Sequence, residues 1–201
     1  MSSVDVKTTF LYGQLTEELY MEQPEGFINK DQERKVMRLK RAIYGIKQAA
    51  LEWWRALDRS MATMGFRRCI SDSGIFVSAT RNQLKVVVIV YVDDAIFMGR
   101  NEQEVQQAKE LFMRTWECRD LGPTKEFLRM TIERKGKTIE LDQRDYLKKV
   151  LERFNMINAK SVPTPLPSGY IPTPSDGPVD EQLRTRYQQV IGSLLYLMLG
   201  T

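Results

Sequence analysis

The segment LKVVVIVYVDDAIFMGR, from Leu84 to Arg100, constrains the fold more than any other part of the chain. Its first half is almost continuously apolar and rich in Val and Ile, which is typical of a buried strand. A second apolar run follows two adjacent carboxylates, Asp93 and Asp94. We therefore expect two antiparallel strands joined at the aspartates. Taken alone, the aspartate pair is most simply a hairpin turn, because Asp suits turns.

The chain contains no histidine, and this absence limits the chemistry that is open to it. It excludes a Ser-His-Asp triad, a Cys-His pair, an HExxH zinc helix and the His-Glu site of deaminases. Any catalysis must rest on carboxylates, lysines, hydroxyls or a metal ion held by oxygen atoms. Oxygen ligands favour magnesium or manganese.

The cysteines and the hydropathy indicate an intracellular protein, and the charge bears on its partners. Cys69 and Cys118 have no partner spacing, which is typical of a reducing compartment and predicts packing roles for both. No apolar run approaches the roughly 20 residues that cross a bilayer, and the chain does not begin like a signal peptide. The net charge of +4 is a weak indication of a polyanionic partner, and basic residues gather between Lys35 and Lys47.

Hydrophobic spacing predicts a mixture of strands and helices, an α+β class. Besides the central hairpin, we expect strands near 3–11 and 74–79 and a second hairpin at 126–141 that turns at Gly136. Helices are expected at 46–64, 101–116, 142–154 and 180–199, and Asn101 and Asp142 are the expected caps. Six prolines between Val162 and Pro178 predict an extended linker.

Seven blocks then occur in order along nearly the whole chain: DVKTTFLYG, LYMEQPEGF, AIYGIKQAALEWW, YVDD, LGPTKEFLRMTIE, LDQRDYLKKVLERFNM and YQQVIGSLLYL. YVDD alone is short and unspecific, but seven blocks in this order are highly specific. Together they resemble the reverse transcriptase of copia-type LTR retrotransposons, an RNA-directed DNA polymerase.

The resemblance implies a right-hand polymerase palm, an antiparallel sheet packed on helices, with a partial thumb. On this basis we expect a palm at residues 1–121, a hairpin and thumb helix at 122–160, a linker at 161–179, and a C-terminal helix at 180–201 that begins a connection region. We further expect a fragment of a Pol polyprotein without the fingers, weak or inactive as a polymerase by itself, and located in the cytoplasm, in virus-like particles or in the nucleus.

The resemblance also implies the site residues. Asp5, in the first palm motif, together with Asp93 and Asp94 would hold two Mg²⁺ or Mn²⁺ ions; Asp5 and Asp93 would ligate both, and Asp94 would support them. The expected partners are an RNA or DNA template with a primer, and deoxynucleoside triphosphates. The expected substrate-binding residues are Phe10, as a gate beneath the sugar, with Gly45, Lys47, Gln48 and Tyr91.

The chain departs from the family pattern at three positions. Ala50 replaces a Pro, Gln14 replaces an acidic residue, and Arg129 replaces a Gly that lets the backbone approach the primer. Two alternatives to a polymerase remain open: a non-catalytic nucleic-acid-binding remnant of the same family, and a small α+β interaction module in which the aspartates are only a turn. Joint binding of manganese or magnesium by the three aspartates distinguishes the polymerase from the remnant, and the interaction module would require the seven blocks to occur by coincidence.

Overall fold

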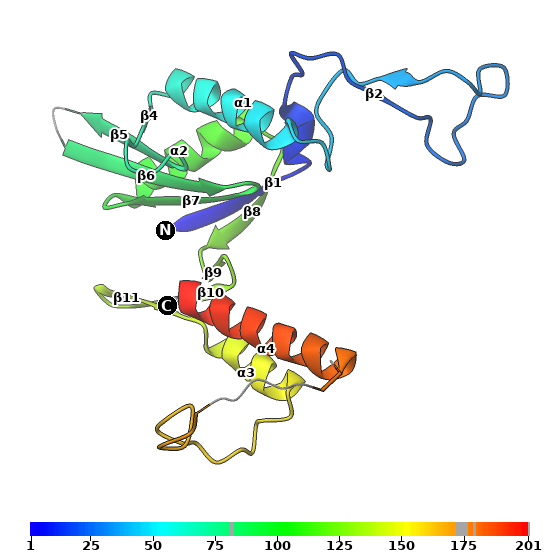
Figure 1. Ribbon diagram of the computed structural model, residues 1–201. Helices are drawn as coiled ribbons and strands as arrows, with labels where there is room; N and C mark the ends of the chain where they lie inside the picture. The colour runs from blue at the N-terminus through cyan, green and yellow to red at the C-terminus, as the bar shows by residue number, and fades with distance from the viewer. Residues whose placement is uncertain (81–82, 172–176, 179, 201) are drawn as a thin grey trace. The chain divides into compact units, whose positions relative to one another are not determined.

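The computed structural model describes residues 1–80, 83–171, 177–178 and 180–200. The chain divides into two compact units, Met1–Thr124 and Lys125–Thr201, and each is described by itself. Both units combine helices with strands that pair antiparallel (Figure 1). The predicted α+β class with antiparallel sheets is therefore confirmed.

A six-stranded antiparallel sheet with the strand order β4-β5-β6-β7-β1-β8 forms the centre of the first unit. The central hairpin predicted from the sequence is the β6–β7 pair, which brings the two apolar runs side by side. The N-terminal strand β1 lies between β7 and β8. The strands are β1 (Ser2–Val6), β4 (Arg67–Arg68), β5 (Ile75–Thr80), β6 (Gln83–Tyr91), β7 (Asp94–Gly99) and β8 (Cys118–Pro123).

Two helices, α1 (Ala49–Thr63) and α2 (Glu102–Thr115), pack on one face of this sheet (Figure 1). The side chain of Asn101 accepts a hydrogen bond from the backbone N–H of Gln103 and caps α2 as predicted. The buried core lies between these helices and the sheet, and its largest fully buried side chains are Phe76, Phe97, Phe112 and Met61. Consequently, strand residues that alternate with core residues project from the opposite face.

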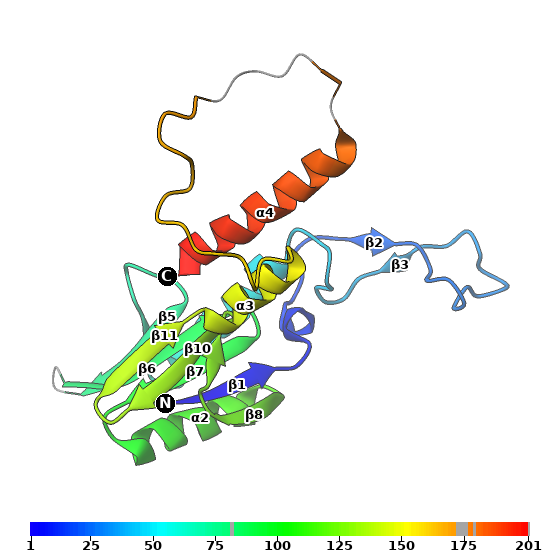
Figure 2. The same cartoon turned by 90° about the horizontal axis from the view of Figure 1, so that it is seen from below.

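The first unit contains short strands that were not predicted from the sequence, and two of them form a hairpin. Between the short 3₁₀ helix η1 (Thr9–Tyr12) and α1, a narrow hairpin of β2 (Tyr20–Met21) and β3 (Met37–Arg38) extends away from the sheet (Figures 1 and 2). The amide of Gln23 bridges the two sides of this hairpin through the carbonyl groups of Gln32 and Lys35. The paired part of this hairpin is only two residues on each side.

The second unit contains a three-stranded sheet and two helices. Its elements are β9 (Glu126–Phe127), β10 (Met130–Lys135), β11 (Thr138–Asp142), α3 (Arg144–Arg153) and α4 (Glu181–Gly200). A continuous strand from Glu126 to Glu133 was expected, but the chain reverses at Leu128 and Arg129, whose φ angles are 51° and 63°. The predicted turn at Gly136 is confirmed.

Helix α4 supports this unpredicted turn. The hydroxyl of Tyr196 donates a hydrogen bond to the carbonyl oxygen of Leu128 at 3.0 Å, and its ring lies 4.7 Å from the ring of Tyr146 on α3. The expected Pro-rich linker lies partly outside the described residues, and residues 161–171 form neither helix nor strand. None of the helices in the described ranges is long and apolar enough to cross a membrane.

Candidate active site

The two aspartates of the central hairpin lie at a two-residue turn. Strand β6 ends at Tyr91 and β7 begins at Asp94, so Val92 and Asp93 form the connection. Val92 has a φ of 56°, a left-handed conformation that β-branched residues rarely adopt but that tight hairpins require. The turn is therefore strained, and surrounding contacts must hold it.

Two hydrogen bonds hold this turn from neighbouring elements. The indole N–H of Trp53, on α1, donates to the carbonyl oxygen of Val92 at 2.9 Å. The backbone N–H of Val6, at the end of β1, donates to the carbonyl oxygen of Asp93 at 2.7 Å. Trp53 is 4% exposed, so it both packs in the core and supports the strained turn. A buried Trp usually needs a partner for its N–H, and this was the available signal.

The third carboxylate, Asp5, lies directly beside the pair. Asp5 on β1 is in antiparallel register with Asp94 on β7. Val4 and Val6 belong to the core on the helix side, as do Ala95 and Phe97, so Asp5 and Asp94 both project from the opposite face. Directly opposed residues in such a pair have Cβ atoms about 4.5–5.5 Å apart.

The same register extends across four strands. Tyr91 on β6 pairs with Asp94, and Arg119 on β8 pairs with Asp5. The helix-free face of the sheet therefore carries a row in the order Tyr91, Asp94, Asp5, Arg119, and Asp93 adjoins it in the turn. Arg119 and the strand that carries it were not singled out from the sequence.

The donor chemistry at this end of the sheet fits a magnesium or manganese ion, because it consists of carboxylate oxygens. Among the residues that the structure describes, however, no three acidic, Cys or His side chains are grouped closely enough to hold a metal ion. The backbone thus brings Asp5, Asp93 and Asp94 to adjacent positions. Their joint ligation of metal remains a prediction.

The carboxylate of Asp5 influences the titration of its neighbour Cys118. Partial burial raises the pKa of the Cys118 thiol to about 11, and the negative charges of Asp5 and Glu117 add to this effect. Cys118 pairs with Val6 and packs against the core, so it is a structural thiol rather than a nucleophile.

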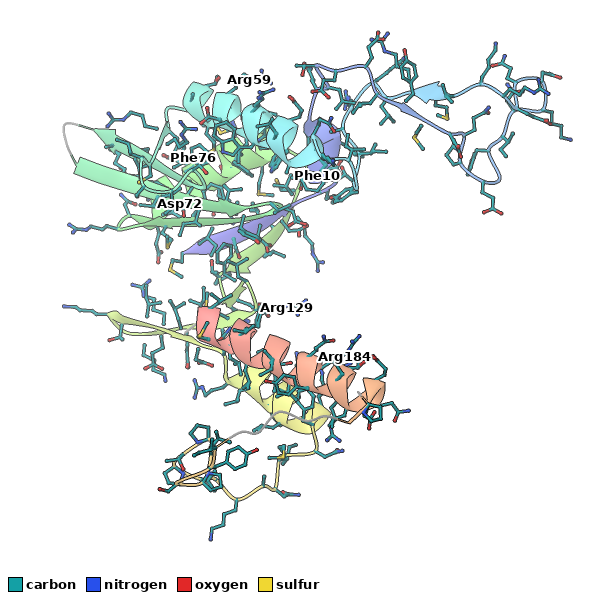
Figure 3. All side chains as sticks on the ribbon, in the orientation of Figure 1. Phe10, Arg59, Asp72, Phe76, Arg129 and Arg184 are labelled. Atoms are coloured by element: carbon teal, nitrogen blue, oxygen red, sulfur yellow. The ribbon has the colours of Figure 1, made fainter. Side chains whose placement is uncertain are left out.

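The residues predicted to bind substrate lie in two places. Tyr91 belongs to the row described above, and the others lie on η1 or just before the start of α1. Phe10, on η1, lies beside the start of α1 (Figure 3), and its ring contacts that of Tyr44 at 4.8 Å in an edge-on arrangement. This contact joins Phe10 to the segment that contains Gly45, which has a φ of 93°. Lys47 is exposed, whereas Gln48 donates to the carboxylate of Glu17 at 2.7 Å.

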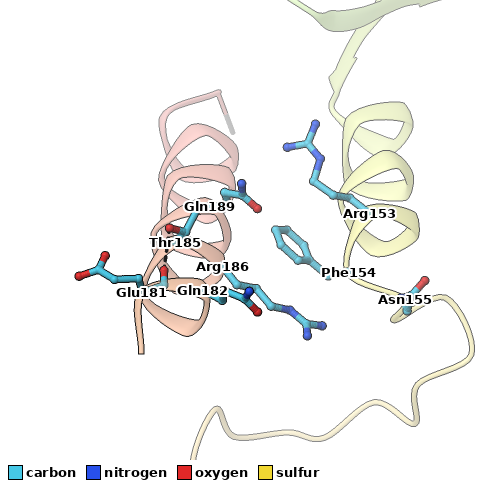
Figure 4. A pocket seen from close by; sticks show the side chains of 8 residues that line it. All are labelled: Arg153, Phe154, Asn155, Glu181, Gln182, Thr185, Arg186 and Gln189. Atoms are coloured by element: carbon cyan, nitrogen blue, oxygen red, sulfur yellow. Dashed lines mark hydrogen bonds between the residues drawn. The ribbon is translucent and has the colours of Figure 1, made fainter. Parts of the chain in front are cut away.

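A cavity of about 580 Å³ lies in the second unit between α3 and α4 (Figure 4). None of the predicted site residues contributes to it. Inside it, the hydroxyl of Thr185 is already bonded to the carbonyl oxygen of Glu181. The lining residues are Arg153, Phe154, Asn155, Glu181, Gln182, Thr185, Arg186 and Gln189.

Comparison with known proteins decides the family. A family model described as "Reverse transcriptase (RNA-dependent DNA polymerase)" matches residues 1–168. The chain belongs to this reverse transcriptase family. The predicted resemblance to copia-type reverse transcriptases is confirmed.

The relatives of this reverse transcriptase chain are transposon proteins. It is 35% identical over 213 residues to the retrovirus-related Pol polyprotein from transposon TNT 1-94 of Nicotiana tabacum, covering 100% of this chain and 16% of the polyprotein. It is also 35% identical over 195 residues to the Pol polyprotein from transposon RE1 of Arabidopsis thaliana, covering 96% and 13%. A putative transposon Ty5-1 protein of Saccharomyces cerevisiae is 28% identical over 194 residues, covering 96% and 62%. No solved structure matches.

Proposed function

We propose that this reverse transcriptase chain carries a polymerase site that adds deoxynucleotides to the 3′-hydroxyl of a primer on an RNA or DNA template. The observation that carries the proposal is the in-register pairing of Asp5 with Asp94, next to Asp93, on the face of the sheet that the helices leave uncovered. In this interpretation the six-stranded sheet with α1 and α2 is the palm, and the hairpin and α3 of the second unit belong to the thumb.

The three aspartates are the proposed ligands of two magnesium or manganese ions. When bound, two divalent ions stabilise both the attacking and the leaving oxygen of an in-line phosphoryl displacement. Asp5 and Asp93 are the proposed shared ligands, and Asp94 is the supporting carboxylate. The contacts of Trp53 and Val6 with the turn serve this role, because they hold the backbone that presents the carboxylates.

Phe10 and the segment that begins at Tyr44 are the proposed nucleotide contacts. Their ring contact supports the idea that both act on one substrate, with Phe10 beneath the sugar and Gly45, Lys47 and Gln48 over the base. A bulky ring in that place collides with a ribose 2′-hydroxyl, so it would favour deoxyribonucleotides. Tyr91, which is 56% exposed at the end of the row, is the proposed contact to the primer end.

A primer-extension assay tests the proposal. The 201-residue protein is given an RNA template with a DNA primer, deoxynucleoside triphosphates and Mg²⁺ or Mn²⁺. We expect Asp93→Asn and Asp5→Asn to abolish extension and to weaken Mn²⁺ binding measured by calorimetry. Asp72→Asn is the matched control, since Asp72 is exposed in a loop and accepts a hydrogen bond from the N–H of Gly74 that Asn can also accept. Extension by Asp93→Asn at the wild-type rate would remove the aspartates from the mechanism.

The second candidate, a non-catalytic nucleic-acid-binding remnant, is favoured by one observation. Within the described ranges the acidic side chains form no cluster of three that could hold a metal ion. This candidate predicts template–primer binding without extension and no Mn²⁺ binding that depends on Asp5. The same assay, accompanied by a filter-binding titration, separates the two functions.

A further inference from the structure

Arg119 occupies the one position of the site row that carries positive charge. It pairs directly with Asp5, and its neighbours in sequence show which way it faces. Cys118 packs against the core, and Asp120 is bonded to Lys109 of α2, so both lie on the helix side of β8. Arg119 between them therefore projects from the same face as Asp5 and Asp94.

A hydrogen-bonded charge network around the buried Lys109 supports this register. Lys109 is 4% exposed, and its ammonium donates to both carboxylate oxygens of Asp120, at 2.8 and 3.0 Å, and to the hydroxyl of Ser2 at 3.0 Å. The hydroxyl of Ser2 in turn donates to the carbonyl oxygen of Gly122 at 2.9 Å. These bonds join α2, β1 and β8 on both sides of the irregularity at Ser3 and Val4, where the register shifts by one residue.

The guanidinium of Arg119 is left available by this arrangement. The side chain is exposed, and in the portion of the chain that the structure describes it has no hydrogen bond or ion pair. Asp5 is its cross-strand neighbour but is half-buried and not bonded to it. A free, planar guanidinium beside a group of carboxylates can bind an anionic group of the substrate. Phosphate is suited to this, because Arg can contact it through two parallel hydrogen bonds.

We propose that Arg119 binds a phosphate group of the substrate next to Asp5, and that the Lys109–Asp120–Ser2 network positions it for this purpose. The inference deepens the proposed polymerase function and rests on it. The phosphate has two possible sources, the triphosphate of the incoming nucleotide and a phosphodiester of the primer strand. Both contain the same anionic oxygens, and binding measurements distinguish them.

The test compares Arg119→Gln with Arg114→Gln in equilibrium binding without turnover. Arg114 is exposed on α2, on the other side of the sheet, so the control removes the same charge without altering the row. We measure the affinity for a template–primer duplex at several salt concentrations and the affinity for a deoxynucleoside triphosphate with Mn²⁺. We expect Arg119→Gln, but not Arg114→Gln, to weaken one of the two by about tenfold, the usual effect of one charge-assisted hydrogen-bonded contact.

The affinity that changes in Arg119→Gln identifies the source of the phosphate. A duplex contact lowers the slope of log affinity against log salt by about 0.9, because one phosphate contact is lost. A triphosphate contact weakens nucleotide binding and leaves that slope unchanged. Arg119→Lys keeps the charge but not the planar fork, so we expect an affinity between those of the wild type and Arg119→Gln.

Two results would overturn the inference. One is an equal effect of Arg114→Gln, which would assign the change to net charge alone. The other is an unchanged affinity for both ligands in Arg119→Gln. Failure of the proposed polymerase function is seen separately, in the absence of any difference between wild type and Asp93→Asn in primer extension, and it does not depend on the behaviour of Arg119.

Discussion

The strain at Val92 leads to a prediction whose sign is unusual: replacing this residue by Gly should destabilise the protein less than replacing it by Ala. In an ordinary turn or strand, Gly is about 0.5–1 kcal/mol less favourable than Ala, because the unfolded chain gains freedom. At Val92 the φ of 56° adds the opposite effect, since a left-handed conformation costs a residue with a Cβ atom about 1–2 kcal/mol. The balance favours Gly over Ala by about 0.5 kcal/mol.

The measurement is urea unfolding of Val92→Gly and Val92→Ala, followed by tryptophan fluorescence. All three tryptophans, Trp53, Trp54 and Trp116, belong to the first unit, so the signal reports the unit that contains the turn. Comparison with Ala removes the effect of the lost methyl groups, which is small because Val92 is 41% exposed. If the Gly variant is less stable than the Ala variant by about 1 kcal/mol, the turn does not hold the left-handed conformation. We also expect Val92→Gly to slow primer extension, because a misplacement of about 1 Å costs on the order of a hundredfold.

Two further predictions concern titratable groups. The hydrogen bond from Lys109 holds the pKa of Asp120 below its usual value, so this pair stabilises the fold above the unfolded carboxyl pKa of about 4 and loses its effect as the pH falls through the lower folded pKa. The stability gap between wild type and Lys109→Met, from urea midpoints at pH 7 and pH 3, should therefore narrow at the lower pH, and a constant gap would contradict the pairing. With iodoacetamide at pH 8, Cys69 should react well before Cys118. A hydrogen bond with Ser71 lowers the pKa of Cys69, whereas burial raises the pKa of Cys118 to about 11. Mass spectrometry of the labelled peptides gives the order of reaction.

Local signals predicted most of the elements but not how they pair. The apolar runs on either side of Asp93 predicted β6 and β7, and Asn101 predicted the start of α2. Strand β8 was missed because CRDLGP has neither alternation nor strand-forming residues. It pairs with β1, and Lys109 bonds to side chains on both strands, a contact that local sequence does not reveal. The register that places Asp5 opposite Asp94 arises between segments almost ninety residues apart. The family resemblance indicated that these aspartates belong together, but it did not indicate Arg119.

The reversal at Leu128 and Arg129 was unpredictable for a different reason. Two consecutive left-handed residues usually require Asn-Gly or Asp-Gly, and this chain has a Leu and an Arg there. The conformation must then be imposed by tertiary contacts, and Tyr196 on α4 supplies one. The substitution of Gly by Arg129, noted from the sequence as a departure from the family, thus occurs at a backbone position that favours Gly.

The hydrogen bond between Tyr196 and Leu128 affects where the protein can be truncated for experiments. The region that matches the family ends at residue 168, whereas Tyr196 lies in α4, well beyond it. A recombinant fragment trimmed to residue 168 would keep the β9–β10 reversal but lose the hydroxyl that holds it, together with the ring that packs on Tyr146. The boundary of the family match is therefore a poor cloning boundary, and α4 belongs with the hairpin that it supports.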